Sequence, residues 1–134
     1  NIGTMVRTAD AADFAGVVFG KVTADVFNPK VQRAMQGSQF HIRLVLGNLD
    51  EWTQSFKQAK IPVYGTELNP QAKNYQTIEK ADDFALIMGN EGNGMSPELL
   101  TQTTANLYIP IKGKAESLNV AVAAGILMFS LKDI

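Results

Sequence analysis

Three short segments combine polar side chains with glycines or a helix start at spacings that could hold a ligand. In the first, residues 1–9, Arg7 and Thr8 interrupt an otherwise apolar helical pattern. An arginine guanidinium can grip a phosphate through two parallel hydrogen bonds, so Arg7 is a candidate for binding an anion. An isolated arginine is more commonly a solvated surface residue, and the residues alone leave both interpretations open.

The second segment is a glycine-rich loop with Gly89, Glu91, Gly92 and Gly94. Glycines let a backbone turn sharply and approach a ligand closely, because no Cβ stands in the way. The spacing is not that of a dinucleotide-binding loop, and no phosphate-binding lysine follows, so a nucleotide phosphate site is not favoured. A plain Asn-Gly turn with a solvated Glu91 explains the loop about equally well.

The third segment, residues 109–120, leads into an apolar helix. Ser117 is predicted to be the N-cap residue of that helix, with Asn119 in the first turn. A buried amide without a partner costs about 1 to 3 kcal/mol, so Asn119 needs one. Backbone capping would be a structural explanation, and holding a polar group of a ligand would be a functional one.

Helices and strands alternate along the chain. Helical periodicity predicts helices over residues 1–14, 29–37, 49–60 and 118–131, and a further one that opens at Ser96 and Pro97. Strands are predicted over residues 16–20, 42–46, 61–65, 84–88 and 107–111, and the continuous apolar run 84–88 is typical of a strand buried on both faces. The pattern predicts an α/β fold with an open, mostly parallel sheet and helices on both faces. Ligands of such sheets bind beyond the carboxyl ends of the strands.

Composition narrows the class of protein. The 134 residues are 46% hydrophobic and 19% charged, which suits a single globular domain over residues 1–134. There is no cysteine and only one histidine, so a disulfide framework is excluded and no metal site is expected. His41 has no serine or carboxylate at a recognisable spacing, and we leave it out of the candidate site.

Charge and hydropathy bear on partners and location. The net charge of −1 gives no basic footprint over the whole domain. A local basic path could form from Lys21, Lys30, Arg33, Arg43, Lys112 and Lys114. The longest apolar run falls short of the roughly 20 residues that span a membrane, and no signal peptide is evident, so a cytoplasmic protein without membrane contact is expected.

Taken together, the three segments resemble the signature motifs of the SpoU (TrmH-like) branch of the SPOUT RNA methyltransferases. The matching patterns are Asn-x-Gly-x-x-x-Arg-Thr-Ala at the start, Gly-x-Glu-x-x-Gly in the loop from Gly89, and Ser-Leu-Asn-Val from Ser117. The resemblance covers essentially the whole chain. It implies an enzyme that transfers a methyl group from S-adenosyl-L-methionine to a ribose 2′-hydroxyl of RNA, leaving S-adenosyl-L-homocysteine.

The same resemblance implies a C-terminal trefoil knot, which topology rules alone would not suggest. It assigns catalysis to Arg7, which would grip the RNA phosphate and help activate the hydroxyl, in a site shaped by Asn1, Glu91, Ser117 and Asn119. The cofactor would contact Tyr64, Gly65, Thr66, Gly89, Glu91, Gly92, Ile109, Ile111, Ser117, Leu118 and Asn119. Relatives form homodimers in which the arginine reaches toward the partner's pocket, and they carry a strand before the first motif that residues 1–134 lack.

Two other functions remain as alternatives. One is a non-catalytic RNA-binding or assembly module with the same fold, which cofactor binding would distinguish. The other is an α/β enzyme that uses a nicotinamide or a nucleoside triphosphate, which the absence of both phosphate-loop patterns weakens. Residues 33–38 look more like those of ribosomal-RNA relatives, so ribosomal RNA is favoured over transfer RNA as the substrate.

Overall fold

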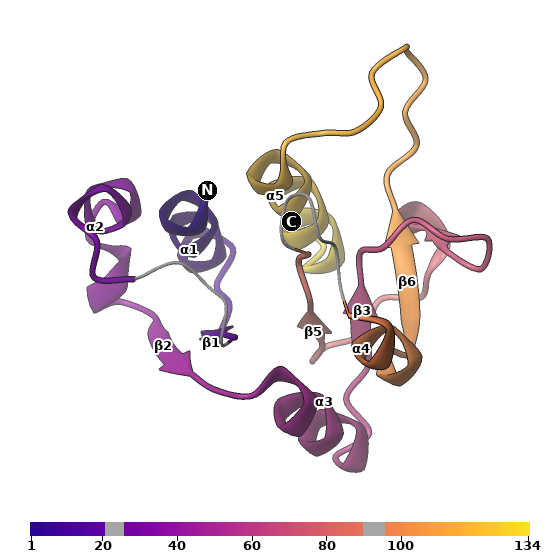
Figure 1. The fold of residues 1–134 in the computed structure, drawn as a ribbon, viewed down its shortest axis with the longest axis horizontal. Helices are drawn as coiled ribbons and strands as arrows, with labels where there is room; N and C mark the ends of the chain where they lie inside the picture. Colours follow the sequence, from indigo (N-terminus) through magenta and orange to yellow (C-terminus); the bar gives the residue numbers. More distant parts are fainter. Residues whose placement is uncertain (21–25, 90–95) are drawn as a thin grey trace.

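The chain folds as strands enclosed by two groups of helices. A computed structural model describes residues 1–20, 26–89 and 96–134. Helices α1 (Ile2–Ala11) and α5 (Val120–Leu131) lie on one side of the strands, and α3 (Leu49–Gln58) and α4 (Pro97–Gln102) lie on the other (Figure 1). Helix α2 (Pro29–Met35) packs beside α1. The predicted α/β fold is confirmed.

All strand pairs in the described residues are parallel, in two separate pieces. In the first, β1 (Gly16–Phe19) pairs with β2 (Arg43–Leu46). The second has the order β4-β6-β3-β5 and consists of β4 (Lys73–Asn74), β6 (Ala105–Tyr108), β3 (Val63–Gly65) and β5 (Ala85–Leu86). The predicted parallel pairing is therefore confirmed, but the described strands form two sheets and not the single open sheet that was predicted.

Capping residues fix where several helices begin. Asn28 accepts a hydrogen bond from Lys30 N at 2.8 Å ahead of α2, and Asn48 accepts one from Glu51 N at 3.1 Å at the start of α3. Ser96 does the same for Leu99 N at 3.1 Å, with Pro97 as the first residue of α4. These bonds satisfy N–H groups that have no partner inside the helix.

Helix α5 joins two groups of buried side chains. One lies between α1, α2, β1 and α5, and its members include Val6, Phe19, Met35 and Met128. The other lies between β3, β6 and α5 and consists of Tyr64, Leu107, Leu127 and Leu131. Because α5 contributes to both groups, it holds α1 and the four-stranded sheet in one arrangement.

The prediction of a strand over 84–88 buried on both faces is wrong in extent and in burial. Strand β5 covers only Ala85–Leu86, and the whole run is half-buried. In the described part of the chain β5 pairs only with β3, and β1 only with β2, so each has an edge without a ladder partner. The rings of Phe14 and Phe84, 5.5 Å apart and edge to face, bridge the region between the two pieces.

Two other predicted boundaries move. Strand β6 begins at Ala105 and ends at Tyr108, ahead of Pro110, because proline cannot donate a ladder hydrogen bond. Helix α2 ends at Met35, and the next two residues, Gln36 and Gly37, both have positive φ, so the chain turns there. Among the described residues no helix has both the length and the apolarity to cross a membrane.

Candidate functional site

The first and third motifs meet at the N-terminal ends of α1 and α5. The Asn119 side-chain Nδ2 donates to Asn1 Oδ1 at 3.4 Å. The Asn119 Oδ1 accepts from the backbone N–H groups of Ala121 at 2.9 Å and Val122 at 3.2 Å. One amide therefore starts α5 and links it to α1, across almost the entire sequence.

The predicted positions of Ser117 as N-cap and Asn119 in the first turn are wrong, whereas backbone capping by Asn119, one of its two proposed explanations, is confirmed. The helix begins at Val120, so Asn119 is its N-cap and not part of the first turn, and it is exposed rather than buried. Asparagine caps helices as well as serine does, and here its amide also reaches Asn1. Ser117 lies two residues before the cap and is exposed.

Arg7 lies on the exposed face of α1. That face comprises Asn1, Thr4, Arg7 and Ala11. Within the described part of the chain the guanidinium has neither a hydrogen-bond partner nor an ion-pair partner. The neighbouring Thr8 instead faces α5, where its Cγ2 would lie 3.7 Å from a Cβ added at Gly125. Arg7 is therefore held on a packed helix with its donors available to a ligand.

Several predicted cofactor-binding residues gather where β3, β5 and β6 end. Tyr64 and Gly65 are buried, and Thr66 Oγ1 donates to Ile87 O at 2.9 Å, which ties the segment after β3 to the residues just before Gly89. Ile109 packs against the buried group that contains Tyr64. Burial, with a smaller contribution from Glu79, raises the pKa of the Tyr64 phenol, so this hydroxyl stays neutral near pH 7.

The remaining predicted residues are not brought to these strand ends. Ile111, Ser117 and Leu118 are exposed, Ile111 by 39% and Leu118 by 38%, in the segment that joins β6 to α5. This segment extends away from the strands before it returns to α5 (Figure 1). Glu91 and Gly92 lie outside the described residues.

A cluster around Asp10 was missed by sequence reasoning. Its carboxylate Oδ2 accepts from Ser38 Oγ at 2.8 Å and lies 3.1 Å from His41 Nδ1. The Ser38 and His41 contacts, in that order, lower the pKa of Asp10. The partners are 28 and 31 residues away in sequence, so no motif spacing could have shown the cluster. It fixes α1 to the turn Ser38–Phe40.

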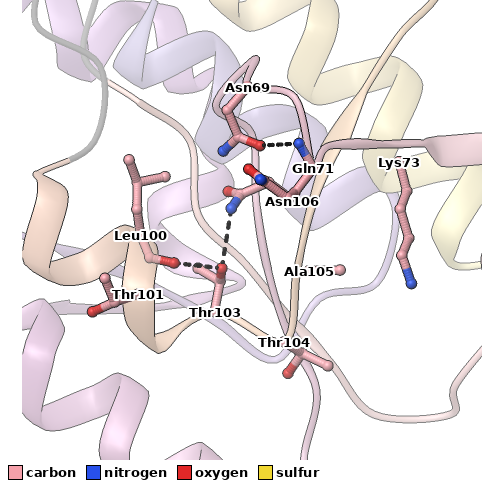
Figure 2. A pocket seen from close by; sticks show the side chains of 9 residues that line it. All are labelled: Asn69, Gln71, Lys73, Leu100, Thr101, Thr103, Thr104, Ala105 and Asn106. Carbon is pink, nitrogen blue, oxygen red and sulfur yellow. Dashed lines mark hydrogen bonds between the residues drawn. The ribbon is translucent and has the colours of Figure 1, made fainter.

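A polar cavity of about 390 Å³ lies elsewhere, beside α4 and β6 (Figure 2). Its lining consists of Asn69, Gln71, Lys73, Leu100, Thr101, Thr103, Thr104, Ala105 and Asn106. Asn106 Nδ2 donates to Thr103 Oγ1 at 3.2 Å, and its buried Oδ1 has no partner among the described residues. No residue of the predicted site lines this cavity, so it is separate from the meeting point of α1 and α5.

Known proteins resemble the chain along almost its full length. A 23S rRNA (guanosine(2553)-2′-O)-methyltransferase of Bacillus subtilis is 52% identical over 132 residues, which are 98% of this chain and 53% of that protein. The S-adenosylmethionine-bound rRNA methyltransferase of Sinorhizobium meliloti superimposes with a TM-score of 0.90 at 36% identity, over 98% of this chain and 51% of the other.

A second solved structure also has a similar fold. The SpoU methyltransferase AviRb of Streptomyces viridochromogenes, in complex with the same cofactor, gives a TM-score of 0.87 at 28% identity, over 98% of this chain and 54% of that protein. The chain thus spans about half the length of these relatives. The family model for SpoU rRNA methylases matches residues 1–129, and the chain therefore belongs to the SpoU rRNA methylase family.

Proposed function

We propose that this chain is the catalytic domain of an S-adenosyl-L-methionine-dependent methyltransferase acting on a ribose 2′-hydroxyl of ribosomal RNA. The observation that carries the proposal is the Asn1–Asn119 contact at 3.4 Å, which joins the two ends of the chain beside the helix that presents Arg7. The relative at 52% identity, named for 2′-O-methylation of 23S rRNA, favours ribosomal over transfer RNA.

The residues at the strand ends suit the cofactor. Gly65 ends β3, and the segment that follows it is held in a fixed conformation because Thr66 Oγ1 donates to Ile87 O at 2.9 Å. Ile109 adds an apolar surface next to them, which an adenine ring can contact. Ile111 and Leu118, both part-exposed, supply further apolar surface if the segment between β6 and α5 closes over the strand ends. When bound, S-adenosyl-L-methionine supplies an electrophilic sulfonium methyl group.

In this proposal the protein's main task is alignment. A ribose hydroxyl has a pKa far above neutrality, so its oxygen must be positioned and its proton given a route. Arg7 binds the adjacent phosphate and favours the developing negative charge on the 2′-oxygen. Asn1 and Asn119 hold the start of α1 against the start of α5. Ser117 and Glu91 are assigned to the same site by the resemblance of their motifs.

A homodimer is part of the proposal. Val122 and Ile126 lie one turn apart on α5 and are 53% and 36% exposed, so they form an apolar stripe on the outer face of α5. A second copy of the chain would cover this stripe. Because α5 also packs on α1, such a dimer places Arg7 close to the partner subunit.

We also infer that the sheet of the whole protein has one more strand, formed by residues upstream of Asn1. The evidence is that β1 and β5 each have an edge without a ladder partner in the described residues. A strand that precedes α1 in a right-handed βαβ unit lies beside β1, which is where the edge without a ladder partner is found. The same strand could pair with β5 and join the two sheet pieces. The position of β6 between β3 and β4, followed by the return of α5 to pack against Tyr64, supports the C-terminal trefoil knot that the family resemblance implies.

The decisive experiment is isothermal titration of S-adenosyl-L-methionine and S-adenosyl-L-homocysteine into the full-length protein, followed by methyl transfer to a 23S rRNA transcript. We expect micromolar cofactor binding and a methyl group that maps to a ribose 2′-oxygen. RNA binding without cofactor binding would identify a non-catalytic module, and methylation of a base would overturn the proposed chemistry. Because the substrate is rRNA, the proposed location is the cytoplasm.

A further inference from the structure

We propose that the segment around Phe40, Arg33 and Arg43 binds unpaired nucleotides of the RNA substrate, with a base stacked on Phe40. We call this segment, residues 27–43, the Phe40 surface. The inference rests on the proposed function, because it assumes an RNA substrate, and it adds a contact region that the three motifs do not include.

Charge is distributed unevenly along the chain, and the Phe40 surface carries only positive charge. The whole chain has 12 basic and 13 acidic residues. Residues 26–49 contain no aspartate or glutamate, yet they include Lys30, Arg33 and Arg43, all of them exposed. Within this segment the cations have no acidic neighbour in sequence. The Asp10 carboxylate, which reaches the segment from α1, is engaged by Ser38 Oγ at 2.8 Å and by His41 Nδ1 at 3.1 Å, so Lys30, Arg33 and Arg43 remain to attract phosphate.

Phe40 is the most exposed of the large apolar side chains in the described residues, at 83%. Phe27, at the other end of the same surface, is 74% exposed. An exposed ring between basic residues is the combination that binds single-stranded nucleic acid, because a base stacks on the ring while the flanking phosphates meet the cations. A paired helix would not offer its bases to the ring.

The turn that presents Phe40 is held in place by its neighbours. Ser38 Oγ bonds to Asp10 Oδ2 at 2.8 Å, and Gln39 Nε2 donates to Gln32 Oε1 at 3.0 Å. The backbone N–H of Phe40 donates to Gly37 O at 3.0 Å. The ring is therefore presented on an ordered turn, so less entropy is lost when a base stacks on it.

The Phe40 surface borders the helix that carries Arg7. Helices α1 and α2 are in close contact, since a Cβ added at Gly3 would lie 2.5 Å from Val31 O. Figure 1 shows α2, α1 and α5 side by side along one side of the strands. An RNA strand bound over α2 can therefore continue across α1 to the start of α5, where the methyl transfer site is proposed.

The test uses the full-length protein and a short, fluorescein-labelled single-stranded RNA, with binding followed by fluorescence anisotropy at several salt concentrations. Phe40→Ala is expected to weaken RNA binding roughly tenfold, whereas Phe40→Trp, which keeps an aromatic ring, should bind RNA as well as the wild type does. Arg33→Ala and Arg43→Ala should each reduce the slope of log Kd against the logarithm of the salt concentration by about one. Leu68→Ala, at a residue 76% exposed and outside the Phe40 surface, and Lys57→Ala on α3 are the matched controls.

Unchanged affinity of Phe40→Ala would overturn the proposal. A fall in its melting temperature or a change in its oligomeric state would also overturn it, because Phe40 would then be covered by protein rather than RNA. Cofactor titration separates this inference from the proposed function. Loss of RNA binding in Phe40→Ala supports the Phe40 surface even in a protein that binds no cofactor, whereas unchanged RNA binding by Phe40→Ala in an active methyltransferase refutes the surface alone.

Discussion

Asn119 donates its side-chain amide to Asn1 Oδ1 at 3.4 Å while its own oxygen caps α5 through Ala121 N and Val122 N. The two atoms of one amide thus serve different purposes. The oxygen stabilises a helix, and the nitrogen fixes the relation between α1 and α5. Substitutions can separate these two roles.

Asn119→Ala should remove both contacts, whereas Asn119→Asp should keep the capping oxygen and lose only the donor to Asn1. We expect the alanine variant to lose about 1 kcal/mol of unfolding free energy and the aspartate variant to lose little. Both should bind S-adenosyl-L-methionine more weakly. Urea unfolding and calorimetric titration of the same samples measure the two effects, and normal cofactor affinity in both variants would remove Asn119 from the site.

Arg7→Ala should abolish methyl transfer while leaving cofactor affinity nearly intact. An exposed guanidinium without a partner in the described residues contributes little to stability, so the unfolding free energy should change by less than about 0.5 kcal/mol. Single-turnover transfer of a labelled methyl group should fall by roughly a hundredfold or more. Thr4→Ala, on the same exposed face of α1, is the matched control. A large loss of cofactor binding in Arg7→Ala would show that Arg7 is a cofactor ligand.

Val122→Asp should convert a dimer to a monomer, because it places a charge in the apolar stripe of Val122 and Ile126 on α5. Size-exclusion chromatography with light scattering gives the mass. Leu68→Asp changes an apolar residue that is even more exposed, at 76%, and lies away from α5, so it should leave the mass unchanged. A dimer that survives Val122→Asp would mean that another surface joins the subunits.

Gly3→Ala should destabilise the protein although alanine favours helices. The added Cβ would lie 2.5 Å from Val31 O and 2.6 Å from the Ala34 Cβ, so α1 and α2 must move apart at a cost of about 1 to 3 kcal/mol. Gly113→Ala, where nothing lies within 4 Å, is the control and should be neutral. Thermal unfolding compares the two, and a more stable Gly3→Ala would show that the two helices are not in this contact.

Asp10 should make stability depend on pH in the acid range. Because its pKa is lowered in the folded state, the carboxylate stabilises the fold above its unfolded pKa of about 3.9, and this contribution is lost as the pH falls through the lower, folded-state pKa. Asp10→Asn should therefore be less stable than the wild type at pH 7 and approach it in stronger acid. Asp83→Asn, an exposed control, should follow the wild type at every pH. Equal stabilities at pH 7 would mean that Ser38 and His41 do not stabilise the carboxylate.

Local sequence patterns predicted most of the helices and strands. The errors arose where contacts between distant parts of the chain decide whether a segment forms a strand and how deeply it is buried. Residues 49–60 repeat apolar side chains at helical spacing, and α3 covers most of that range. The two residues of β4 were missed, because Lys73–Asn74 has no apolar alternation and becomes a strand only through its pairing with β6. Residues 84–88 were predicted to be fully buried because their composition indicates an interior strand, while β5 lacks a neighbour on one side in the described residues.

The sequence predicts the three motifs of the candidate site but not how their residues are arranged in space. Capping was one of two explanations open for Asn119, but the sequence could not decide which residue is the N-cap, since Ser117 is an equally good capping residue. The cluster of Asp10, Ser38 and His41 could not be found either, because residues with large sequence separations come together only in the fold. Glu91 and Gly92, outside the described residues, stay predictions.

The contact between Asn1 and Asn119 also bears on how the protein folds during synthesis. The two residues are 118 positions apart, and Lys132 Nζ reaches Asp13 O at 2.9 Å over 119 positions. A ribosome must therefore deliver nearly the whole domain before α1 can meet α5. Until then Val6 and Ala9 of the nascent chain lack their final partners on α5, and closing so long a loop makes folding slow. A polypeptide truncated ahead of Ser117 would hold the first two of the three motifs, yet it could not assemble a catalytic pocket.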